Sequence, residues 1–550
     1  MRFRIGLCLV AAVMACRPHA TLVITNGMVW TGLSSGAAQP GAVAMSGDRI
    51  LVAGDSATVA RLVGSGTTVI DAHGGLVMPG FADGHTHFVD GGFQLASVDL
   101  RDARTPAEFV RRIKEFAAQR PGAWILGGDW DHTLWPGQTL PRHEWIDSVT
   151  PNNPVWINRV DGHEGLANAA AMQAAKITKD TPTPSGGEVL HDARGELTGI
   201  FKDQAMGLID AAIPDPSPAE TDSAVARALA HAASLGVTAT ANMSASWAGL
   251  ASYRRLQRAG KLTLRVYLYL PLSGWRDVAD TLAREGPAAG DDWVRVAGLK
   301  GFMDGSAGSR TAYFFDAYDD SAGYHGLLQN SEADMRKWIG AADSAGLQIA
   351  VHAIGDRANA ILLAIYDSVA QAHGTRDRRF RVEHAQHLRP EDIAKFGTLH
   401  IVPSMQPYHA IDDGRWVQQR IGPQRIKTTY AFRTLLDDGA PLAFGSDWTV
   451  APIDPILGVY AAVTRRTLDD KNPNGWVPEQ KITVGEALRA YTAGNAWAVF
   501  AEQKWGTLAP GHYADVVVLD HNLFTMPPES LATARVATTV VGGKVVYRKP

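Results

Sequence analysis

Eight apolar, strand-like runs recur along the middle of the chain, and helical stretches separate most of them. The runs are LVMPGFADGHTH, GVTATANM, LTLRVYLYLP, VRVAGLKGFMDG, LQIAVHAIGD, FRVEHAQ, HIVPSMQP and PLAFGSDW. An eightfold alternation of strands and helices closes naturally into a parallel barrel. The sequence therefore predicts an α/β protein built on a (β/α)8 TIM barrel over residues 78–500.

One connection in this pattern is much longer than an ordinary loop. Residues 92–221 separate the first predicted strand from the second, and they contain a helical stretch, PAEFVRRIKEFAAQR, and several β runs. A segment of this length inside a compact domain must have structure of its own. Because it leaves the barrel just after the first strand, we expect an insertion that forms a lid or pocket wall over the mouth. A peripheral decoration is the alternative.

Both ends of the chain are rich in short β runs. Residues 21–77 contain the turn pairs NG and GD between β-rich segments, and residues 501–550 contain further β runs around a Gly-Gly turn. Neither end would bury much surface alone. We therefore expect the two ends to pair into one small composite β-sandwich domain.

The N-terminus resembles an export signal. Arg2 and Arg4 precede an apolar segment that is short for a membrane span, which is typical of a secretory signal over residues 1–20. The sequence VMAC, which ends at Cys16, resembles a bacterial lipobox, and a simple cleaved signal with an incidental cysteine is the alternative. The expected location is the periplasm of a bacterium, or its membrane through a lipid anchor at Cys16.

Composition limits which partners the chain can bind and which residue types can hold a metal. The net charge is −4 and the Lys and Arg residues are scattered, so the chain has no electrostatic footprint for nucleic acid. The only cysteines are Cys8 and Cys16, and neither would serve the mature chain as a zinc ligand or nucleophile. Any metal must then be held by His, by carboxylates or by a modified side chain. Formation of a homo-oligomer stays open.

A pair of histidines in the first predicted strand is the first candidate metal site. His85 and His87 are two residues apart, so on a strand both imidazoles would point the same way and could hold one ion. The pair alone is a weak signal in a chain with 18 His. Further candidates stand at or near the ends of other predicted strands, where a TIM barrel has its active site. They are Lys300, His352, His384 and Asp447.

The motifs together resemble those of a known family. MPGFADGHTH, LKGFMDGSAGSRTA, VHAIGDRAN, VEHAQ, GSDWTVAPIDP and GTLAPGHYADVVVLD are similar to motifs of the amidohydrolase superfamily, in particular its YtcJ-like branch, which is related to N-substituted formamide deformylase. The similarity covers nearly the whole mature chain. It implies that His85 and His87 bind the more buried metal, and that His352 and His384 bind a second metal or position water and substrate.

The resemblance also assigns roles to a lysine and an aspartate. It places Lys300 where many members carry an N6-carboxylated lysine that bridges two metals. The alternative is an unmodified lysine that pairs with Asp304 or orients substrate, in a site that then suits a single metal. Asp447 would bind metal and shuttle a proton. The implied cofactor is one or two Zn²⁺ ions, or another divalent metal.

The implied function is hydrolysis of a non-peptide carbon–nitrogen bond in a small amide, with deacylation or deformylation preferred. Zinc makes hydroxide available at neutral pH, and Asp447 would pass its proton to the leaving amine. His384 would also take part, and His163 in VDGHEG would stabilise the oxyanion or else make a structural hydrogen bond. Hydrolysis of a cyclic amide, a lactone or another ester is the alternative, and a non-catalytic exported binding protein is a further one.

Other residues are expected around the site. Asp304 and Arg310 would shape the loop after the fourth strand, and His387 would adjoin the site or lie at the surface. The expected pocket walls, which favour an apolar or aromatic group on the substrate, are Trp130, Gln406, Tyr408 and Trp448.

Overall fold

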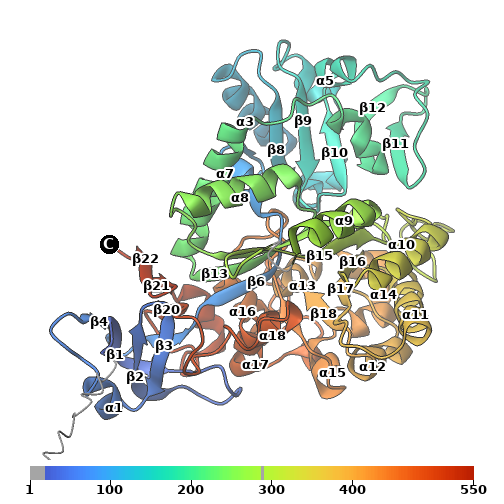
Figure 1. The fold of residues 1–550 in the computed structure, drawn as a ribbon. Helices are drawn as coiled ribbons and strands as arrows, with labels where there is room; N and C mark the ends of the chain where they lie inside the picture. Colours follow the sequence, from blue (N-terminus) through green and yellow to red (C-terminus); the bar gives the residue numbers. More distant parts are fainter. Residues whose placement is uncertain (1–18, 287–289) are drawn as a thin grey trace, which may run out of the picture.

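The middle of the chain forms a parallel eight-stranded barrel (Figure 1). This computed structural model describes residues 19–286 and 290–550. The strands follow one another around the barrel in chain order, and an isolated parallel bridge between Thr86 and Trp448 brings the last end round to the first. They are β6 (Phe81–Thr86), β13 (Val237–Asn242), β14 (Arg265–Pro271), β15 (Val294–Phe302), β16 (Gln348–Ala353), β17 (Arg381–His384), β18 (Val402–Met405) and β19 (Ala443–Phe444). Each lies in one of the eight predicted runs, so the predicted barrel is confirmed.

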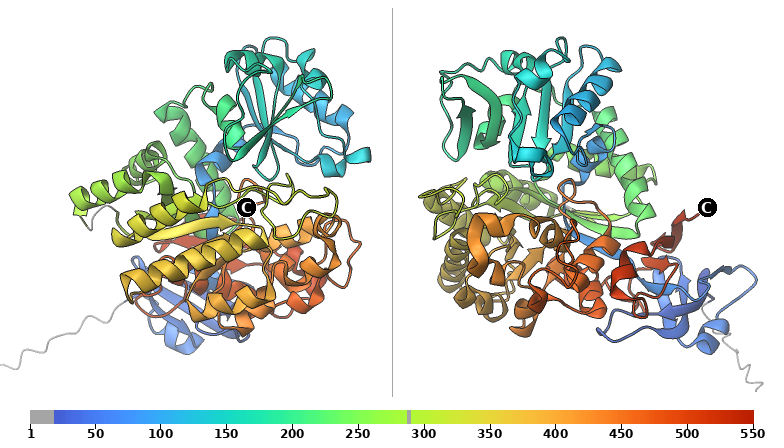
Figure 2. Two further views of the ribbon diagram at one scale, coloured as in Figure 1. Left: turned by 90° about the vertical axis from the view of Figure 1, so that its right-hand side faces the viewer. Right: turned by 180° about the vertical axis from the view of Figure 1, so that it is seen from behind.

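Helices cover the outside of the barrel (Figures 1 and 2). Local capping sets where several of them begin: the side chains of Ser217, Ser246 and Ser331 accept backbone N–H groups in the first turns of α7, α8 and α10. Such a cap stabilises a helix by about 1 kcal/mol. The barrel helices include α7 (Pro218–Ser234), α8 (Trp247–Arg258), α9 (Trp275–Glu285), α10 (Glu332–Ser344), α11 (Asp356–His373), α12 (Pro390–Thr398), α15 (Phe432–Asp437), α16 (Pro455–Thr464), α17 (Val484–Ala490) and α18 (Ala493–Ala498).

The first predicted run is divided between two sheets. Its first half is β5 (Leu76–Pro79), which pairs with strands of the end sheet, and only β6 belongs to the barrel. The change occurs at Gly80, where a Cβ atom would lie 2.3 Å from the side chain of Thr238. Only glycine lets the chain pass this close to the neighbouring strand. The barrel strand therefore begins at Phe81, slightly later than the barrel boundary at residue 78 that the sequence predicted.

The two chain ends share one sheet. Its strand order is β22-β21-β20-β5-β1-β2-β3, with β4 paired to β1. A buried ion pair fastens it to the barrel, with the Arg265 Nε atom 2.6 Å from an Asp515 carboxylate oxygen. The strands are β1 (Leu22–Val29), β2 (Gln39–Ser46), β3 (Arg49–Gly54), β4 (Thr68–Asp71), β20 (Val516–Leu519), β21 (Val536–Val541) and β22 (Lys544–Arg548), and α1 (Ser56–Ala60) follows β3.

The long connection after β6 folds as a separate layer above the barrel (Figures 1 and 2). The chain first forms α2 (Phe88–Gln94) and returns to the barrel through α7. Between them lies a six-stranded sheet in the order β11-β12-β10-β9-β8-β7. Its strands are β7 (Val98–Asp99), β8 (Ile125–Trp130), β9 (Val155–Arg159), β10 (Glu164–Ala167), β11 (Gly187–His191) and β12 (Leu197–Asp203); its helices include α3 (Pro106–Ala118), α4 (Glu144–Asp147), α5 (Ala169–Ala174) and α6 (Gly207–Asp210). We call this part the insertion.

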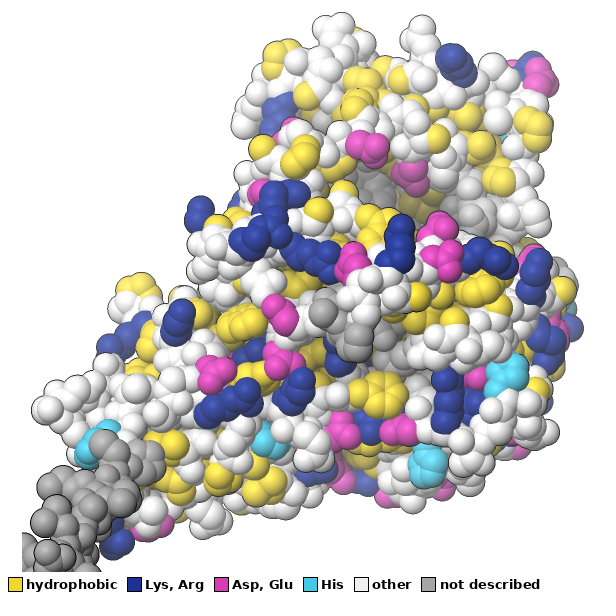
Figure 3. Space-filling view, in the orientation of Figure 1, with side chains coloured by type: hydrophobic (Ala, Val, Ile, Leu, Met, Phe, Trp, Pro, Cys, Tyr) yellow, Lys and Arg dark blue, Asp and Glu magenta, His cyan; other side chains and the backbone are white. Residues whose placement is uncertain are grey.

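The predicted signal and lipobox, including Cys16, lie outside the described residues, apart from His19 and Ala20. In the described ranges, no helix combines the length and apolar character that crossing a bilayer requires. On the face shown in Figure 3, Lys and Arg side chains alternate with Asp and Glu side chains.

Candidate metal centre

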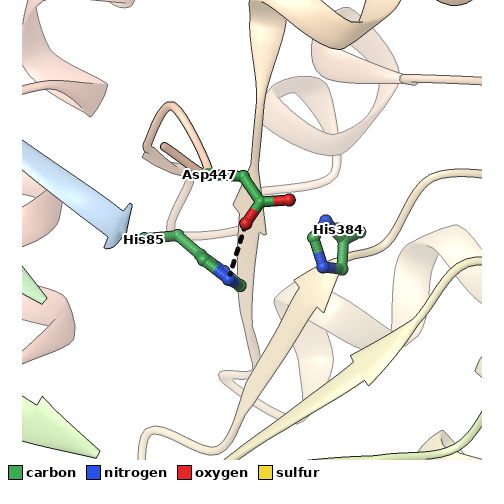
Figure 4. Close-up of side chains that lie close together, drawn as sticks. All are labelled: His85, His384 and Asp447. Atoms are coloured by element: carbon green, nitrogen blue, oxygen red, sulfur yellow. Dashed lines mark ion pairs between the residues drawn. The ribbon is translucent and has the colours of Figure 1, made fainter. Parts of the chain in front are cut away.

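Three ligand-type side chains from distant parts of the chain converge at the carboxyl end of the barrel (Figure 4). Candidate ligand atoms of His85, His384 and Asp447 all lie within 4.8 Å of one another. His85 lies near the end of β6, His384 ends β17, and Asp447 follows β19. Because the carboxyl ends of parallel barrel strands meet at one mouth, these positions bring the three side chains together.

The backbone at two of these residues is unusual. His384 has φ 74° and Asp447 has φ 58°, both in the left-handed region that residues other than glycine rarely adopt. Such backbone strain persists only where the surrounding structure fixes it, and it clusters at functional sites.

The other predicted ligands lie around this cluster. The His87 Nε2 atom is 3.3 Å from Asp447 Oδ1, the same distance as the His85 Nε2 atom. The rings of His352 and His384 have centroids 4.5 Å apart. Lys300 is buried on β15, with Nζ 4.7 Å from the centre of the Phe302 ring. Five of the six predicted ligands are thus linked by these contacts, and Lys300 approaches from the fourth strand.

The orientation of His85 fits a metal ion. Its Nδ1 atom lies 2.6 Å from Glu383 Oε2, and Glu383 in turn accepts a hydrogen bond from Arg381 Nε at 2.7 Å. A carboxylate only accepts, so Nδ1 carries the proton and the lone pair is left on Nε2. Nε2 is buried without a hydrogen-bond partner among the described residues. A buried, unsatisfied nitrogen that faces a carboxylate is what a bound cation would satisfy.

The protonation states agree with this arrangement. Burial lowers the pKa of His85 to about 4, so the imidazole is neutral, as a ligand must be. Burial alone would raise the pKa of Asp447, but the adjacent histidines, His85 above all, hold it well below its ordinary value. Asp447 is therefore ionised at neutral pH. A donor set of neutral imidazoles and one carboxylate suits Zn²⁺.

Lys300 makes no ion pair with a carboxylate among the described residues. Burial lowers the pKa of its amine to about 8. Asp304, the alternative partner, accepts backbone N–H groups from Tyr313, Ile354 and Gly355 at 2.8 to 3.0 Å. It therefore organises the loop after the fourth strand, as predicted, and the alternative in which it pairs with Lys300 is not what the structure shows.

His163 reaches the same cavity from the insertion. Its ring centroid is 5.0 Å from that of His352, and its Nδ1 atom is 2.7 Å from Asp203 Oδ1. Burial works against the charged imidazole, but the hydrogen bond and charge of Asp203 outweigh it and raise the pKa of His163. This histidine differs from His352 and His384, because burial lowers their pKa values well below the ordinary one.

The cavity between barrel and insertion is small, and most of the residues that line it are polar or charged. Its volume is about 60 Å³. The insertion lines it with Asp131, Arg159, Asp161 and His163, and the barrel with residues that include His352, His384, His409, Trp416 and Asp447. Side chains of the insertion thus form part of the wall around the candidate metal centre.

None of the four expected pocket walls lines this cavity. Trp130 is fully buried in the core of the insertion, where its Nε1 atom donates to the Ile157 carbonyl. Trp448 packs edge-on against Phe88. The tryptophan that lines the cavity is Trp416, on the barrel side. Sequence alone could not choose among 15 tryptophans, because the neighbours of each come from remote segments.

The remaining expected residues have other positions. Gln406 holds a predicted ligand, since its Oε1 atom is 2.8 Å from His384 Nδ1. Tyr408 lines an outer pocket of about 490 Å³, which adjoins the cavity and shares Asp131, Arg415 and Trp416 with it. His387 is buried and bonded to Thr429 Oγ1 at 2.8 Å, so the surface alternative for it is wrong. Arg310 pairs with Asp320 at 2.8 Å near the surface.

Sequence reasoning missed Glu383, Arg381 and His409. Arg381 and Glu383 are two residues apart in the strand that ends at His384, so both point to one face, and a charged pair there was a usable signal. His409 has a buried Nε2 atom without a hydrogen-bond partner among the described residues, and no sequence signal singled it out.

Comparison with known proteins agrees with the geometry. Residues 68–547 match the amidohydrolase family. The chain is 38% identical to Protein LONG AFTER FAR-RED 3 of Arabidopsis thaliana over 96% of this chain and 92% of that one. It is 31% identical to the putative amidohydrolase YtcJ of Bacillus subtilis over 88% of this chain and 91% of that one. It is 26% identical to the N-substituted formamide deformylase of Arthrobacter pascens over 92% of this chain and 95% of that one.

A solved structure extends the likeness to three dimensions. A crystal structure of an uncharacterized metal-dependent hydrolase from Pyrococcus horikoshii superposes with a TM-score of 0.74 at 28% identity, and the match covers 92% of this chain and 99% of that one. The matched segment spans both the barrel and the end sheet. The chain therefore belongs to the amidohydrolase family, in the YtcJ-like branch that the motifs indicated.

Proposed function

We propose that this protein hydrolyses the carbon–nitrogen bond of a small, non-peptide amide and depends on a divalent metal, with Zn²⁺ the best fit. The observation that carries the proposal is the buried cluster of His85, His384 and Asp447, in which His85 Nε2 has no hydrogen-bond partner among the described residues. When bound, such a metal polarises a carbonyl group and lowers the pKa of water to near 7.

The ligand roles divide between two sides of the cavity. In a single-metal site, His85, His384 and Asp447 would hold the ion. In a two-metal site, His85, His87 and Asp447 would hold one ion, and His352 and His384 would hold a second. Lys300 would help to hold two ions if its amine reacted with CO2 to form an anionic carbamate. Burial favours that reaction, because only the neutral amine is a nucleophile and the pKa is lowered to about 8.

Two side chains are placed to move protons. Asp447 is ionised, so its carboxylate would accept the proton of the attacking water and deliver it to the leaving nitrogen. His163 lines the cavity and contacts Asp203 through Nδ1, and Asp203 raises its pKa. In the doubly protonated ring, Nε2–H would donate a hydrogen bond to the carbonyl oxygen as negative charge develops there.

The size of the cavity favours a short acyl group. One water molecule needs about 10–15 Å³ of such space, so 60 Å³ holds only a few non-hydrogen atoms. A formyl or acetyl amide fits, and the rest of the substrate must extend outward. The Arthrobacter pascens relative is named for removal of a formyl group from N-substituted formamides, which is an acyl group of this size.

The test is an assay of purified enzyme against N-formyl, N-acetyl and longer N-acyl amines, before and after chelation. We expect the short acyl amides to be cleaved, activity to vanish with the metal and return with Zn²⁺, and His85→Ala to be inactive. His143→Ala changes a histidine of the insertion outside the cavity and is the control.

Cleavage of only cyclic amides, lactones or other esters would replace the proposed substrate class. Saturable ligand binding without turnover would indicate a binding protein. Activity that survives both chelation and His85→Ala would refute the metal-dependent mechanism.

A further inference from the structure

We propose that Asp203 is a positioning residue for catalysis: it fixes the ring of His163 and the nitrogen that carries its proton, and the barrel residue Gln329 completes the contact. The inference rests on the function proposed above and deepens it. Nothing in the motif around His163 reveals the partner, which lies forty residues along the chain.

Strand register brings the two residues together. In the antiparallel pair of β10 and β12, Glu164 is opposite Lys202, so the preceding His163 meets the following Asp203. The backbone N–H of Asp203 donates to the His163 carbonyl at 3.1 Å, and the side chains meet at 2.7 Å. The pair is therefore held by both backbone and side chains.

The backbone at Asp203 is strained. Its φ is 48° and its ψ is −123°, a conformation that residues other than glycine rarely adopt. The side chain is fully buried. Backbone strain of this kind is found mainly at functional sites, and here the strained residue places its buried carboxylate against the imidazole of His163.

The barrel closes around this carboxylate. Gln329 Nε2 donates to Asp203 Oδ1 at 3.0 Å and to the Asp304 carbonyl at 3.1 Å. At Gly305 a Cβ atom would lie 2.7 Å from Asp203 Oδ1, so glycine leaves the room that the carboxylate needs. The carbonyl of the same glycine accepts a hydrogen bond from His352 Nε2 at 3.1 Å. The loop that contains Gly305 therefore both orients the candidate metal ligand His352 and contacts Asp203.

The consequence for His163 follows from the chemistry of the bond. A carboxylate only accepts hydrogen bonds, so Nδ1 of His163 must carry a proton. Nε2 is then the nitrogen left for the substrate, to which it donates when the ring carries a second proton, and the ring itself lies beside that of His352. Without Asp203, either nitrogen could carry the proton and the ring could turn. Fixing ring orientation and tautomer is what a carboxylate does for a functional histidine.

A double-mutant cycle tests whether Asp203 acts through His163. We expect His163→Ala to lower kcat by about 10²- to 10⁴-fold and Asp203→Ala to lower it by about 10- to 100-fold, with smaller changes in KM. In the His163→Ala background, Asp203→Ala should have almost no further effect on kcat. Losses that multiply would overturn the inference, because the carboxylate would then act independently of the imidazole.

A second readout does not depend on turnover. In protein labelled with ¹⁵N-histidine, the Nδ1 proton of His163 should give a downfield signal that disappears in His163→Ala and Asp203→Ala. Asp203→Asn, whose amide oxygen still accepts this bond, should retain the signal and part of the activity. Asp147→Ala is the matched control, because it removes a His–Asp bond of the same 2.7 Å length in the insertion, outside the cavity. It should leave both readouts unchanged.

The two proposals fail in different ways. If the wild-type protein shows the signal but cleaves no amide, the proposed function fails while the Asp203 contact stands. If it cleaves amides but the signal is absent or survives Asp203→Ala, the positioning role fails while the function stands.

Discussion

Replacing Glu383 with Gln tests how the barrel prepares His85 to bind a metal. Glu383 is fully buried between two partners, His85 Nδ1 at 2.6 Å and Arg381 Nε at 2.7 Å. Gln has the same shape but no charge, and it offers one oxygen instead of two. If that oxygen accepts from His85, the amide N–H groups face Arg381. If it accepts from Arg381, they face Nδ1 and favour the tautomer in which Nε2 has lost its lone pair.

The size of the effect can be worked from these contacts. Loss of a partner that orients a metal-bound histidine costs about 10- to 100-fold in metal affinity, or about 1.4–2.8 kcal/mol. Breaking a buried ion pair from one side costs about 3–5 kcal/mol of stability. Arg381 keeps hydrogen bonds to the Gly84 carbonyl at 2.6 Å and to Ser404 Oγ at 3.0 Å. We therefore expect the loss of stability to lie at the lower end of this range, about 3 kcal/mol.

Metal affinity is measured by competition with a chelator of known affinity, and stability by denaturant unfolding of the metal-free protein. Glu502→Gln is the control, because Glu502 also pairs with an arginine, Arg379 at 2.8 Å, but outside the cavity. It should leave metal affinity unchanged. Wild-type metal affinity in Glu383→Gln would refute the reasoning, since His85 would then need no carboxylate to orient it.

Three further predictions have defined outcomes. Lys300→Ala should reduce the metal content from two ions per chain to one or none, measured by elemental analysis, and a retained pair of ions would exclude a bridging role for Lys300. Gly305→Ala places a Cβ atom 1.9 Å from Thr311 Oγ1 and 2.7 Å from Asp203 Oδ1, so it should lower both thermal stability and kcat, and wild-type values would contradict the close packing. Mass spectrometry of the mature protein should find a lipidated Cys16 at the N-terminus if the chain is exported as a lipoprotein, and an unmodified start downstream of Cys16 would exclude the anchor.

The barrel could be predicted because its signals are local. Each strand is a short apolar run, and the candidate ligands His85, His352, His384 and Asp447 stand at or just beyond the strand ends. Parallel strands then bring those ends to one mouth without further information. The division of the first run at Gly80 could not be predicted, because it depends on Thr238 from another strand.

Residues that orient the ligands were harder to find than the ligands. Asp203 meets His163 only through the register of two strands in the insertion, and Gln406 meets His384 only through barrel closure. Trp130 and Trp448 were wrongly expected at the pocket for the same reason: both are core residues whose packing partners are remote in sequence. Contacts of this kind depend on tertiary structure, and no periodicity in the sequence records them.

The contacts between insertion and barrel decide between a lid and a fixed wall. The polar contacts that cross this boundary include Arg415 with Asp131 at 3.5 Å, Ser306 with Asp161 at 2.5 Å, Lys202 with the Ser309 carbonyl at 3.4 Å, and Gln329 with Asp203 at 3.0 Å. At about 0.5–1.5 kcal/mol net for each, their loss to water would cost about 2–6 kcal/mol. An open form would then hold at most a few per cent of the molecules, since each 1.4 kcal/mol is tenfold. We therefore expect the insertion to stay docked as a wall, so that the shape of the cavity would decide which substrates are accepted.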